Sequence, residues 1–488
     1  MSKRPTHALA RHIALTGFMG AGKSTLGATL ATALGRPFVD ADAEIERAAG
    51  ETIAEIFARC GEAEFRLLEE RLVSEALERS DLAVIALGGG ALGCERTRDT
   101  LQKRAFTVLV EIDVDEAWRR VGSGAVRPLA TDQAAFRALF SERLPLYQRF
   151  ADVVCADLDS AILAAGGVHV GPGALARLGD LLPDKGKAAL VIDENVARLY
   201  GEAARRALAG RLISVHELPQ GESAKSFQSF ERLLEDLPLE RGDLIVALGG
   251  GCTTDAAGLA AAVYMRGIDW VSVPTTLVGQ VDAGIGGKTA INVSSGKNLV
   301  GCFHWPARAV ADPELLATLP VKERREGMAE IVKTGLLAGE RLWDLPDAEM
   351  VRRCACHKVR VCLRDQREAG IRTTLNLGHT FAHARETAGG FESPTHGEAV
   401  ALGLLAACRL SVARGLDPVW LDEIEKALAP RPVAVDRELA WAALYRDKKV
   451  SGGTPKFVLL DEPGKPVWGV EIPETEARAA LDSLIVDS

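Results

Sequence analysis

Residues 13–24 read Ile-Ala-Leu-Thr-Gly-Phe-Met-Gly-Ala-Gly-Lys-Ser, a short apolar strand that runs through a glycine loop into a helix. This is the order of the phosphate loop G-x-x-x-x-G-K-[ST] in its expected strand-to-helix context. The glycines that let backbone N–H groups turn toward phosphate oxygens are Gly17, Gly20 and Gly22. Lys23 is placed to reach the β- and γ-phosphates, and Ser24 to bind Mg²⁺. The segment therefore predicts a site for a nucleoside triphosphate, against the alternative of a turn that binds nothing.

The bulk composition is that of a globular protein. The chain has 488 residues, of which 47% are hydrophobic and 26% charged, and its length predicts about three domains. Its net charge of −9 argues against nucleic-acid binding, which requires a basic surface. The cysteines show no metal or disulfide spacing, which indicates a reducing, cytoplasmic compartment. We find neither a signal peptide nor an apolar run long enough to cross a membrane, and expect no membrane partner.

Strand and helix patterns divide the chain into three predicted domains with an overall α/β fold. Residues 1–160 form a phosphate-loop domain with a mostly parallel sheet, whose strands are predicted at 12–16, 82–87, 107–113 and 152–156. Residues 161–316 form a second α/β domain with strands at 189–192, 213–216, 243–248 and 270–273. Residues 317–488 are mainly helical, with helices at 321–338, 347–366, 375–388 and 397–414 and a late hairpin around Pro463-Gly464.

Several acidic and basic residues of the first domain are candidates for binding a ligand. Asp40 and Asp42 end a strand, where one could hold Mg²⁺ and the other accept from a substrate hydroxyl; a solvated strand end is the alternative. Arg66 lies in an acidic helix, either at a ligand or in an ordinary surface ion pair. Gly90 belongs to a triple glycine that follows a strand, and Arg127 lies in a loop that could close over a phosphoryl-transfer site.

Over residues 12–156 the chain resembles shikimate kinase, through the strings G-F-M-G-A-G-K-S, F-V-D-A-D, G-E-x-E-F-R, L-G-G-G, R-P-L and R-x-P-L-Y. The resemblance implies ATP-dependent phosphorylation of the 3-hydroxyl of shikimate, and we expect Ser24 and Asp40 to hold Mg²⁺, Asp40 directly or through water. The residues that it places at shikimate are Asp42, Arg66, Gly90 and Arg143, with the two arginines on the carboxylate. Those that it places at ATP are Gly20, Gly22, Lys23, Ser24, Thr25, Arg120 and Arg127, of which Lys23 and Arg127 are also catalytic candidates.

Two glycine-rich segments of the second domain favour a dinucleotide. Residues 243–255 end a buried strand in three glycines, where a pyrophosphate could approach the backbone; G-x-G-x-x-G is absent, and a plain structural turn is the alternative. Pro274-Thr275-Thr276 ends another strand, and Lys288 and Lys297 lie in the glycine-rich loops that follow. Lysines in such loops are poorly placed for packing and well placed for anions.

Histidines and one glutamate form a candidate metal set in the helical region. His379 and His383 are four residues apart and share a helix face, His396 follows them, and Glu330 lies in an earlier helix. Two histidines and a carboxylate suit an open Zn²⁺ site, and Co²⁺ accepts the same ligands. The alternative is a pair of helix histidines satisfied by their surroundings.

Over about residues 166–488 these features resemble 3-dehydroquinate synthase, through strings such as L-G-G-G-x-x-x-D, V-D-A-G-I-G-G-K-T-A-I-N, G-M-A-E-I-V-K-T-G and L-N-L-G-H-T-F-A-H. The resemblance implies a metal ion held by Glu330, His379 and His396. It places NAD⁺ at Asp193, Asn195, Glu222, Lys225, Gly250, Gly251, Asp255, Thr275, Thr276, Asp282, Lys288, Lys297 and Thr318. It places the substrate at Lys288, Asn298, Lys333, Lys358, Arg372, Asn376, His383 and one of Lys448 and Lys449. Arg266 would reach the site of a neighbouring subunit, which implies a homodimer.

The reaction that this resemblance implies converts 3-deoxy-D-arabino-heptulosonate 7-phosphate to 3-dehydroquinate and phosphate, with NAD⁺ regenerated in each turnover. His383 is the candidate proton shuttle and Lys288 a further catalytic candidate. The two resemblances together imply a bifunctional cytoplasmic enzyme for two non-consecutive steps of aromatic amino-acid precursor synthesis. Two alternatives stay open: a metal-dependent polyol dehydrogenase in the second half, and a non-catalytic nucleotide-binding regulator in the first.

Overall fold

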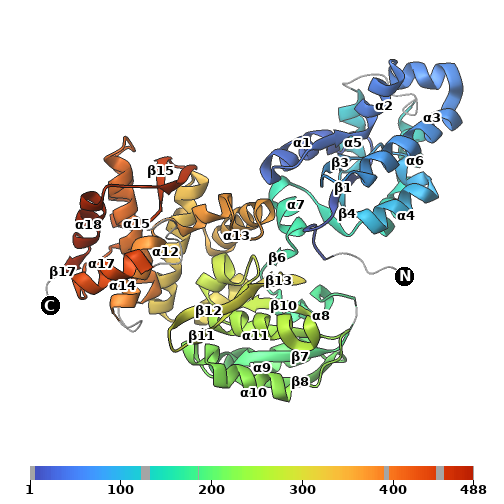
Figure 1. The fold of residues 1–488 in the computed structure, drawn as a ribbon. Coiled ribbons are helices and arrows are strands. Elements are labelled where there is room, and N and C mark those ends of the chain that lie inside the picture. Colours follow the sequence, from blue (N-terminus) through green and yellow to red (C-terminus); the bar gives the residue numbers. More distant parts are fainter. Residues whose placement is uncertain (1–5, 123–131, 185, 390–394, 447–454, 487–488) are drawn as a thin grey trace. The chain divides into compact units, whose positions relative to one another are not determined.

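A computed structural model of the chain describes residues 6–122, 132–184, 186–389, 395–446 and 455–486 (Figure 1). The chain forms two compact units, Met1–Gly167 and Val168–Ser488. Each unit has its own parallel sheet and its own apolar core. None of the described helices combines the length and the hydropathy that a bilayer crossing requires.

A five-stranded parallel sheet forms the centre of the first unit, in the order β2-β3-β1-β4-β5. Its strands are β1 His12–Thr16, β2 Phe38–Asp40, β3 Val84–Ala86, β4 Ala105–Val110 and β5 Val153–Cys155. Every residue of β1 is buried, which explains why the apolar run before the glycine loop forms the middle strand. The four strands predicted for this region are confirmed.

Helices lie around this sheet and follow the carboxyl ends of its strands (Figure 1). They are α1 Lys23–Leu34, α2 Ala41–Ala49, α3 Ile53–Glu78, α4 Glu95–Arg104, α5 Val114–Gly122, α6 Gln133–Phe150 and α7 Leu158–Ala165. The chain passes from β1 into α1, from β2 into α2 and from β3 into a short helix, η1 (Ala91–Gly93). Because the three strands are parallel neighbours, the loops that follow them meet at one edge of the sheet.

The second unit begins with a six-stranded parallel sheet in the order β6-β13-β10-β9-β7-β8. Its strands are β6 Val168–Val170, β7 Ala188–Asp193, β8 Leu212–Leu218, β9 Leu244–Gly249, β10 Asp269–Pro274 and β13 Arg308–Ala311. Its helices are α8 Leu178–Leu181, α9 Glu194–Ala207, α10 Phe227–Asp236 and α11 Gly251–Val263. The four predicted strands are confirmed as β7 to β10. The strands β6 and β13 were missed because each is too short to show a periodic pattern.

An antiparallel hairpin of β11 (Lys288–Val293) and β12 (Gly296–Phe303) follows, where the sequence predicted only glycine-rich loops. No residue of β12 is fully buried, so the strand has no face that packs into a core. Its sequence therefore shows no alternation of apolar and polar residues, the pattern by which a strand with one buried face is predicted. The side chains of Leu299, Val300 and Phe303 are exposed. Asn298, near the turn, has a φ of 55°, in the left-handed region.

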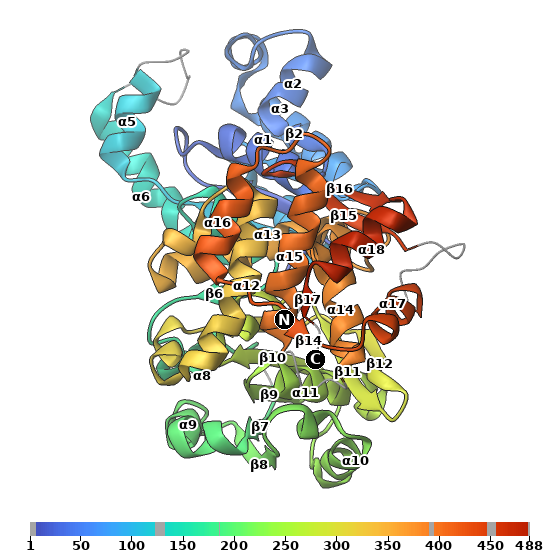
Figure 2. The ribbon, with the colours of Figure 1, turned by 90° about the vertical axis from the view of Figure 1, so that its left-hand side faces the viewer.

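The rest of the second unit is mainly helical, as the sequence predicts (Figure 2). Its helices are α12 Val321–Ala338, α13 Asp347–Arg364, α14 His379–Ala388, α15 His396–Val412, α16 Val419–Leu428, α17 Arg437–Arg446 and α18 Glu474–Asp482. Its strands are β14 Val433–Ala434, β15 Phe457–Glu462, β16 Lys465–Val470 and β17 Ile485–Val486, of which β15 and β16 form the predicted hairpin.

The predicted helix at 375–388 becomes α14 only from His379, because Gly378 interrupts it with a φ of 79°. A Cβ on Gly378 would lie 2.7 Å from Leu404 N of α15, so only glycine allows this close approach. The glycine turn therefore holds the first residue of α14 against α15.

Candidate functional site

The phosphate loop has the backbone that its glycines predict. Gly17, Gly20 and Gly22 have φ of 144°, 80° and 88°, values that residues with a Cβ rarely adopt. Helix α1 begins directly after the loop, so its first N–H groups and positive end are available to an anion. Lys23 Nζ donates to Gly17 O at 2.9 Å and to Phe18 O at 3.1 Å, which places the ammonium group over the loop.

Other residues predicted at the nucleotide lie around this loop. Arg120 of α5 donates from Nη1 to Gly20 O at 3.4 Å and from Nε to Glu116 Oε1 at 2.7 Å, so its guanidinium lies beside the loop. The first turn of α1 contains Ser24 and Thr25. Arg127 lies outside the described residues.

Asp40 is fixed at the carboxyl end of β2. Its Oδ1 accepts from the N–H groups of Asp42 and Ala43 at 3.1 and 3.3 Å, and so caps α2. The cap holds this carboxylate at the strand end where the sequence predicts a Mg²⁺ ligand. It also begins the helix that carries Asp42.

A pocket of about 410 Å³ lies beside the triple glycine that follows β3, and Arg66 of α3 and Arg143 of α6 both line it. Arg143 Nη1 donates to Gly89 O at 3.1 Å. A Cβ on Gly90 would be 2.2 Å from Arg66 Nη1, so any side chain there would displace the guanidinium. Two guanidinium groups on one pocket suit a ligand carboxylate.

Glu69 belongs to this pocket region and was missed in the sequence. Its side chain is buried, and Oε2 accepts from Arg66 Nη1 at 2.6 Å. A Cβ on Gly88 would lie 2.3 Å from Glu69 Oε1 and 2.9 Å from Asp42 Oδ1, so both carboxylates face that glycine. Burial raises the pKa of Glu69 against the opposing charge of Arg66. The three-residue spacing of Arg66 and Glu69 on one helix could have revealed the pair.

Three predicted metal ligands converge in the second unit. Glu330 lies in α12, His379 begins α14 and His396 begins α15. One possible ligand atom from each lies within 4.8 Å of the others. His396 Nε2 is 3.3 Å and His379 Nε2 is 3.5 Å from Glu330 Oε1. A buried carboxylate and two imidazole nitrogens from three helices form a donor set that fits Zn²⁺ or Co²⁺.

Hydrogen bonds fix which nitrogen of each histidine faces Glu330. Nδ1 of His379 lies 3.2 Å from Leu377 O, and Nδ1 of His396 lies 3.0 Å from Glu386 Oε1. Burial lowers the pKa of His379 to about 4. Burial also acts on His396, but its hydrogen bonds to Glu330 and Glu386 prevail and raise its pKa to about 10. Both rings therefore present Nε2 to the carboxylate.

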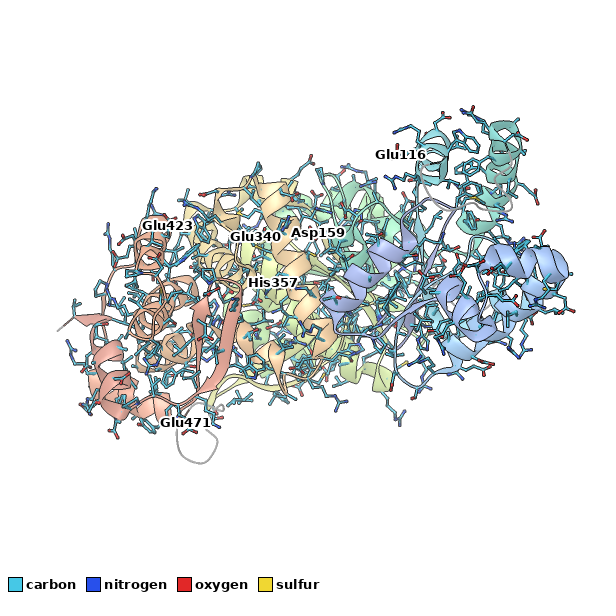
Figure 3. All side chains as sticks on the ribbon, turned by 90° about the horizontal axis from the view of Figure 1, so that it is seen from above. Glu116, Asp159, Glu340, His357, Glu423 and Glu471 are labelled. Carbon is cyan, nitrogen blue, oxygen red and sulfur yellow. The ribbon has the colours of Figure 1, made fainter. Side chains whose placement is uncertain are left out.

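His383 lies beside the ligand set. Its ring centroid is 5.6 Å from that of His379, one turn away on α14. His357 of α13, labelled in Figure 3, is another buried histidine, but it does not belong to the candidate metal-ligand set. Arg360 Nη2 lies 3.1 Å from its Nδ1, and burial lowers its pKa to about 3, so it stays neutral.

Two buried lysines predicted at the substrate pair with carboxylates. Lys333 pairs with Glu330, and Lys358 pairs with Asp282 of the π-helical segment η5 (Gly279–Ala283). Burial alone would raise the pKa of Asp282, but the charges of Lys333 and Lys358 hold it below its ordinary value. The metal-ligand candidate Glu330 is thus joined through lysines to a residue predicted at the cofactor.

Glu368 is a second carboxylate that the sequence analysis missed. It lies 2.5 Å from Lys288 Nζ and accepts from Asn376 Nδ2 at 2.6 Å, so it joins two residues predicted at the substrate. Its φ of 60° is uncommon for a residue with a side chain. The fully buried Arg372 donates from Nη2 to Gly286 O at 2.8 Å in the same region.

Two cofactor candidates of the short helix η3 (Gly221–Lys225) contact the β11–β12 turn. Lys225 Nζ lies 2.5 Å from Asp255 Oδ2 and also contacts Asn298. Glu222 Oε1 lies 3.0 Å from Lys297 Nζ. The structure therefore brings residues predicted at NAD⁺ into contact with one predicted at the substrate.

The glycines after β9 lie against the end of β10. A Cβ on Gly250 would be 3.1 Å from Thr276 Cγ2, and Gly251 begins α11. Thr275 N donates to Gly249 O at 2.9 Å across the two strands. The ends of these parallel neighbours and the start of α11 form an edge at which a pyrophosphate can meet backbone N–H groups.

Two further cofactor candidates lie at the start of α9 and beside it. Asp193 ends β7 and caps α9 by accepting from Asn195 N at 2.8 Å and Val196 N at 3.2 Å. Thr318 Oγ1 lies 2.8 Å from the hydroxyl of Tyr200, which belongs to α9. Both contacts use the side chains that the sequence predicts at NAD⁺.

Arg266 is exposed just beyond α11, where its φ is 67°. Val263 and Met265 beside it are also exposed. Its contact with a neighbouring subunit stays a prediction. The predicted substrate lysines Lys448 and Lys449 lie outside the described residues.

Three family models match the chain. The shikimate kinase model matches residues 19–165, the 3-dehydroquinate synthase N-terminal model residues 215–326, and the 3-dehydroquinate synthase C-terminal model residues 327–450. A 3-dehydroquinate synthase from Gloeobacter violaceus is 42% identical over 346 residues, which cover 65% of this chain and 96% of that relative.

Two solved structures resemble the second part of the chain. The 2-epi-5-epi-valiolone synthase of Streptomyces hygroscopicus subsp. jinggangensis 5008, with NAD⁺ and Zn²⁺ bound, is 30% identical with a TM-score of 0.59. A 2-deoxy-scyllo-inosose synthase complexed with carbaglucose-6-phosphate, NAD⁺ and Co²⁺ is 27% identical with a TM-score of 0.58. Each match covers 65% of this chain and 96% of the matched chain.

Proposed function

We propose a role for each site from one premise: the chain belongs to the 3-dehydroquinate synthase family, and residues 19–165 form a shikimate kinase domain. The chain is a fused, bifunctional enzyme of the shikimate pathway. Its first unit phosphorylates shikimate with ATP, and its second converts 3-deoxy-D-arabino-heptulosonate 7-phosphate to 3-dehydroquinate and phosphate. The observation that carries the second activity is the convergence of Glu330, His379 and His396 within 4.8 Å.

In the kinase site, the phosphate loop and Lys23 bind and orient the phosphates of ATP. Ser24 and Asp40 hold Mg²⁺, Arg120 lies against adenine, and Arg127 closes over the phosphates. The carboxylate of shikimate binds between the guanidinium groups of its pocket, and Asp42 accepts the proton of the 3-hydroxyl. The set at shikimate is Asp42, Arg66, Gly90 and Arg143. The last three line one pocket, and the Asp42 carboxylate faces Gly88 of the same triple glycine.

In the synthase site, Glu330, His379 and His396 hold Zn²⁺ or Co²⁺. When bound, this ion supplies polarisation of a substrate hydroxyl, and NAD⁺ supplies reversible hydride acceptance. His383, next to the ligands on α14, moves a proton of the substrate. The anionic groups of the substrate bind Lys288, Lys333, Lys358, Arg372 and one of Lys448 and Lys449, and its hydroxyl groups bind Asn298 and Asn376.

The proposed NAD⁺ site follows the carboxyl edge of the six-stranded sheet. Gly250 and Gly251 leave room for the pyrophosphate at the start of α11. The other residues of this site are Asp193, Asn195, Glu222, Lys225, Asp255, Thr275, Thr276, Asp282, Lys288, Lys297 and Thr318. The contacts of Lys225 and Glu222 with the hairpin turn support a cofactor site that adjoins the substrate site.

We also propose the domain boundaries, the cellular compartment and the oligomeric state. The domains are residues 1–167, 168–316 and 317–488: the first boundary lies after α7 rather than at residue 160, and the long helices from α12 onward follow the last strand of the six-stranded sheet. The enzyme works in the cytoplasm. It acts as a homodimer through its synthase part, in which Arg266, exposed beside Val263 and Met265, reaches the neighbouring subunit.

Two product assays on the whole chain test both activities. Phosphate release from 3-deoxy-D-arabino-heptulosonate 7-phosphate should pass through many turnovers on trace NAD⁺; steady accumulation of NADH would instead identify a polyol dehydrogenase. ADP release should depend on shikimate, and ADP release without that dependence would favour a nucleotide-binding regulator. Lys23→Ala should abolish ADP release and leave phosphate release unchanged, whereas loss of both would contradict independent sites.

A further inference from the structure

His396 is the most exposed of the proposed metal ligands. Its side chain is 40% exposed, against 10% for His379 and 0% for Glu330. Packing therefore restrains the ring of His396 less than it restrains the other two side chains. An imidazole at this position needs a hydrogen bond to hold one orientation and one tautomer.

Glu386 makes that hydrogen bond. The two ring nitrogens of His396 face different carboxylates: Nε2 lies 3.3 Å from Glu330 Oε1, and Nδ1 lies 3.0 Å from Glu386 Oε1. The side chain of Glu386 is only 15% exposed, so water competes little for it. Glu386 lies on α14, the same helix that begins with His379, so one helix fixes the positions of both histidines.

We propose that Glu386 is a positioning residue of the metal centre: it accepts the Nδ1 proton of His396 and so commits Nε2 to the metal ion. The proposal rests on the metal site proposed above. A carboxylate on the far side of a ligand imidazole fixes its tautomer and increases its basicity. His379 offers the internal contrast, because its Nδ1 faces the neutral main-chain oxygen of Leu377 at 3.2 Å. The two histidines thus differ in the charge of the group behind the ring.

The geometry distinguishes this role from direct ligation. The possible ligand atoms that lie within 4.8 Å of one another come from Glu330, His379 and His396. Glu386 contacts the ring nitrogen that points away from Glu330. It therefore acts on the metal through His396, and replacing it should weaken the site without removing a ligand.

The test is a Co²⁺ titration of the whole chain after chelation, followed by the visible absorption of bound Co²⁺. Glu386→Gln should weaken Co²⁺ binding about 10- to 100-fold and change the absorption bands, because outer partners of metal ligands have effects of this size. Glu386→Asp, which keeps the charge, should recover part of the affinity. Glu398→Gln is the matched control, since Glu398 caps α15 through Thr395 N at 3.0 Å and does not contact the ring; it should bind Co²⁺ as the wild type does.

The outcomes separate this inference from the site on which it rests. If the wild type fails to bind Co²⁺, the proposed metal site itself is wrong. If the wild type binds and Glu386→Gln binds with the same affinity and spectrum, only the role of Glu386 is overturned. Shikimate-dependent ADP release by the first unit reports that each variant chain is intact, and thermal unfolding reports on the second unit. Should Glu386→Gln unfold that unit, the comparison of Glu386→Asp with Glu398→Gln decides. Because aspartate is shorter and moves the carboxylate away from Nδ1 of His396, equal Co²⁺ affinity together with equal absorption bands contradicts the proposal.

Discussion

Two cations of the kinase site and two of the synthase site contact different kinds of partner, although Arg66 of the kinase site also pairs with a carboxylate, Glu69. In the kinase site Lys23 donates to main-chain oxygens of its own loop, and Arg143 donates to Gly89 O. In the synthase site Lys358 pairs with Asp282 and Lys288 with Glu368. A neutral carbonyl competes weakly for a cation, whereas a carboxylate in a low-dielectric site competes strongly. An anionic substrate must therefore displace or rearrange the ion pairs of Lys288 and Lys358 in the second site.

The burial of these ion pairs also affects the free energy of unfolding. Removing one partner of a buried ion pair leaves an uncompensated charge and is destabilising by about 3–5 kcal/mol, whereas an exposed pair contributes about 0–1 kcal/mol. The side chains of Lys333 and Glu330 are 2% and 0% exposed. Residues proposed to bind ligands in the synthase site, such as Lys333 and Glu330, therefore also stabilise their unit, and a substitution there should affect folding and activity together.

We expect the largest effect from Glu330→Gln, which removes the buried carboxylate of the synthase site that pairs with Lys333. The variant loses a proposed metal ligand and leaves Lys333 without its carboxylate. We expect phosphate release to fall by at least about 10³-fold, since a bound metal ion contributes several kcal/mol to the transition state. Shikimate-dependent ADP release, measured on the same sample, should stay unchanged. Normal phosphate release by this variant would show that Glu330 is not a ligand.

A smaller effect is expected from Asp282→Asn, measured as the free energy of unfolding of the second unit in urea. The variant leaves Lys358 unpaired in a buried region, so stability at neutral pH should fall by about 3 kcal/mol. Because Lys333 and Lys358 hold the pKa of Asp282 below its ordinary value, the wild type has this stabilisation above the unfolded pKa of about 4 and loses it as the pH falls further. The two proteins should therefore converge in acid.

Asp347→Asn is the matched control for that measurement. Asp347 pairs with Arg324 in the same unit, but their side chains are 40% and 38% exposed. We expect a loss of at most about 1 kcal/mol. If both substitutions lowered the free energy of unfolding equally, burial would not explain why one ion pair stabilises the unit more than the other.

The fold and much of each candidate site could be predicted because the sequence contains short motifs rich in glycine, lysine or histidine, residue types that phosphate and metal sites require. The phosphate loop is contiguous, and its glycines have the positive φ that the motif requires. Glu330, His379 and His396 lie in three separate segments, yet each follows a recognisable string, and the structure brings them together. The longer parallel strands of both sheets followed from continuous apolar runs, whereas the short strands β6 and β13 did not.

The carboxylate partners could not be predicted from such strings, and only the Arg66–Glu69 pair has a helix spacing that indicates it. Glu69, Glu368 and Glu386 each lie in a charged segment that reads as a solvated surface. Their roles appear only when folding places a distant or helix-neighbouring cation or imidazole beside them. The β11–β12 hairpin was missed for a related reason: without a fully buried face on β12, it has no periodic apolar pattern.

The smallest effect concerns Glu69, the one buried carboxylate partner described in the kinase site. Glu69→Gln weakens the hydrogen bond that orients Arg66, a charged bond worth about 1.5–3 kcal/mol, so the KM for shikimate should rise about tenfold while the KM for ATP stays unchanged. Because burial raises the pKa of Glu69, its carboxylate gains a proton at a higher pH than an ordinary glutamate. The KM of the wild type should therefore approach that of the variant as the pH falls.

Glu62→Gln decides whether the effect belongs to burial or to any acidic neighbour of Arg66. Glu62 also pairs with Arg66, at 3.0 Å, but its side chain is 51% exposed, against 4% for Glu69. A solvated pair of this kind contributes little, so the KM for shikimate should change less than about threefold. If Glu62→Gln raised the KM as much as Glu69→Gln does, the buried carboxylate would have no special role. Arg66 would then depend equally on its solvated and its buried carboxylate partner.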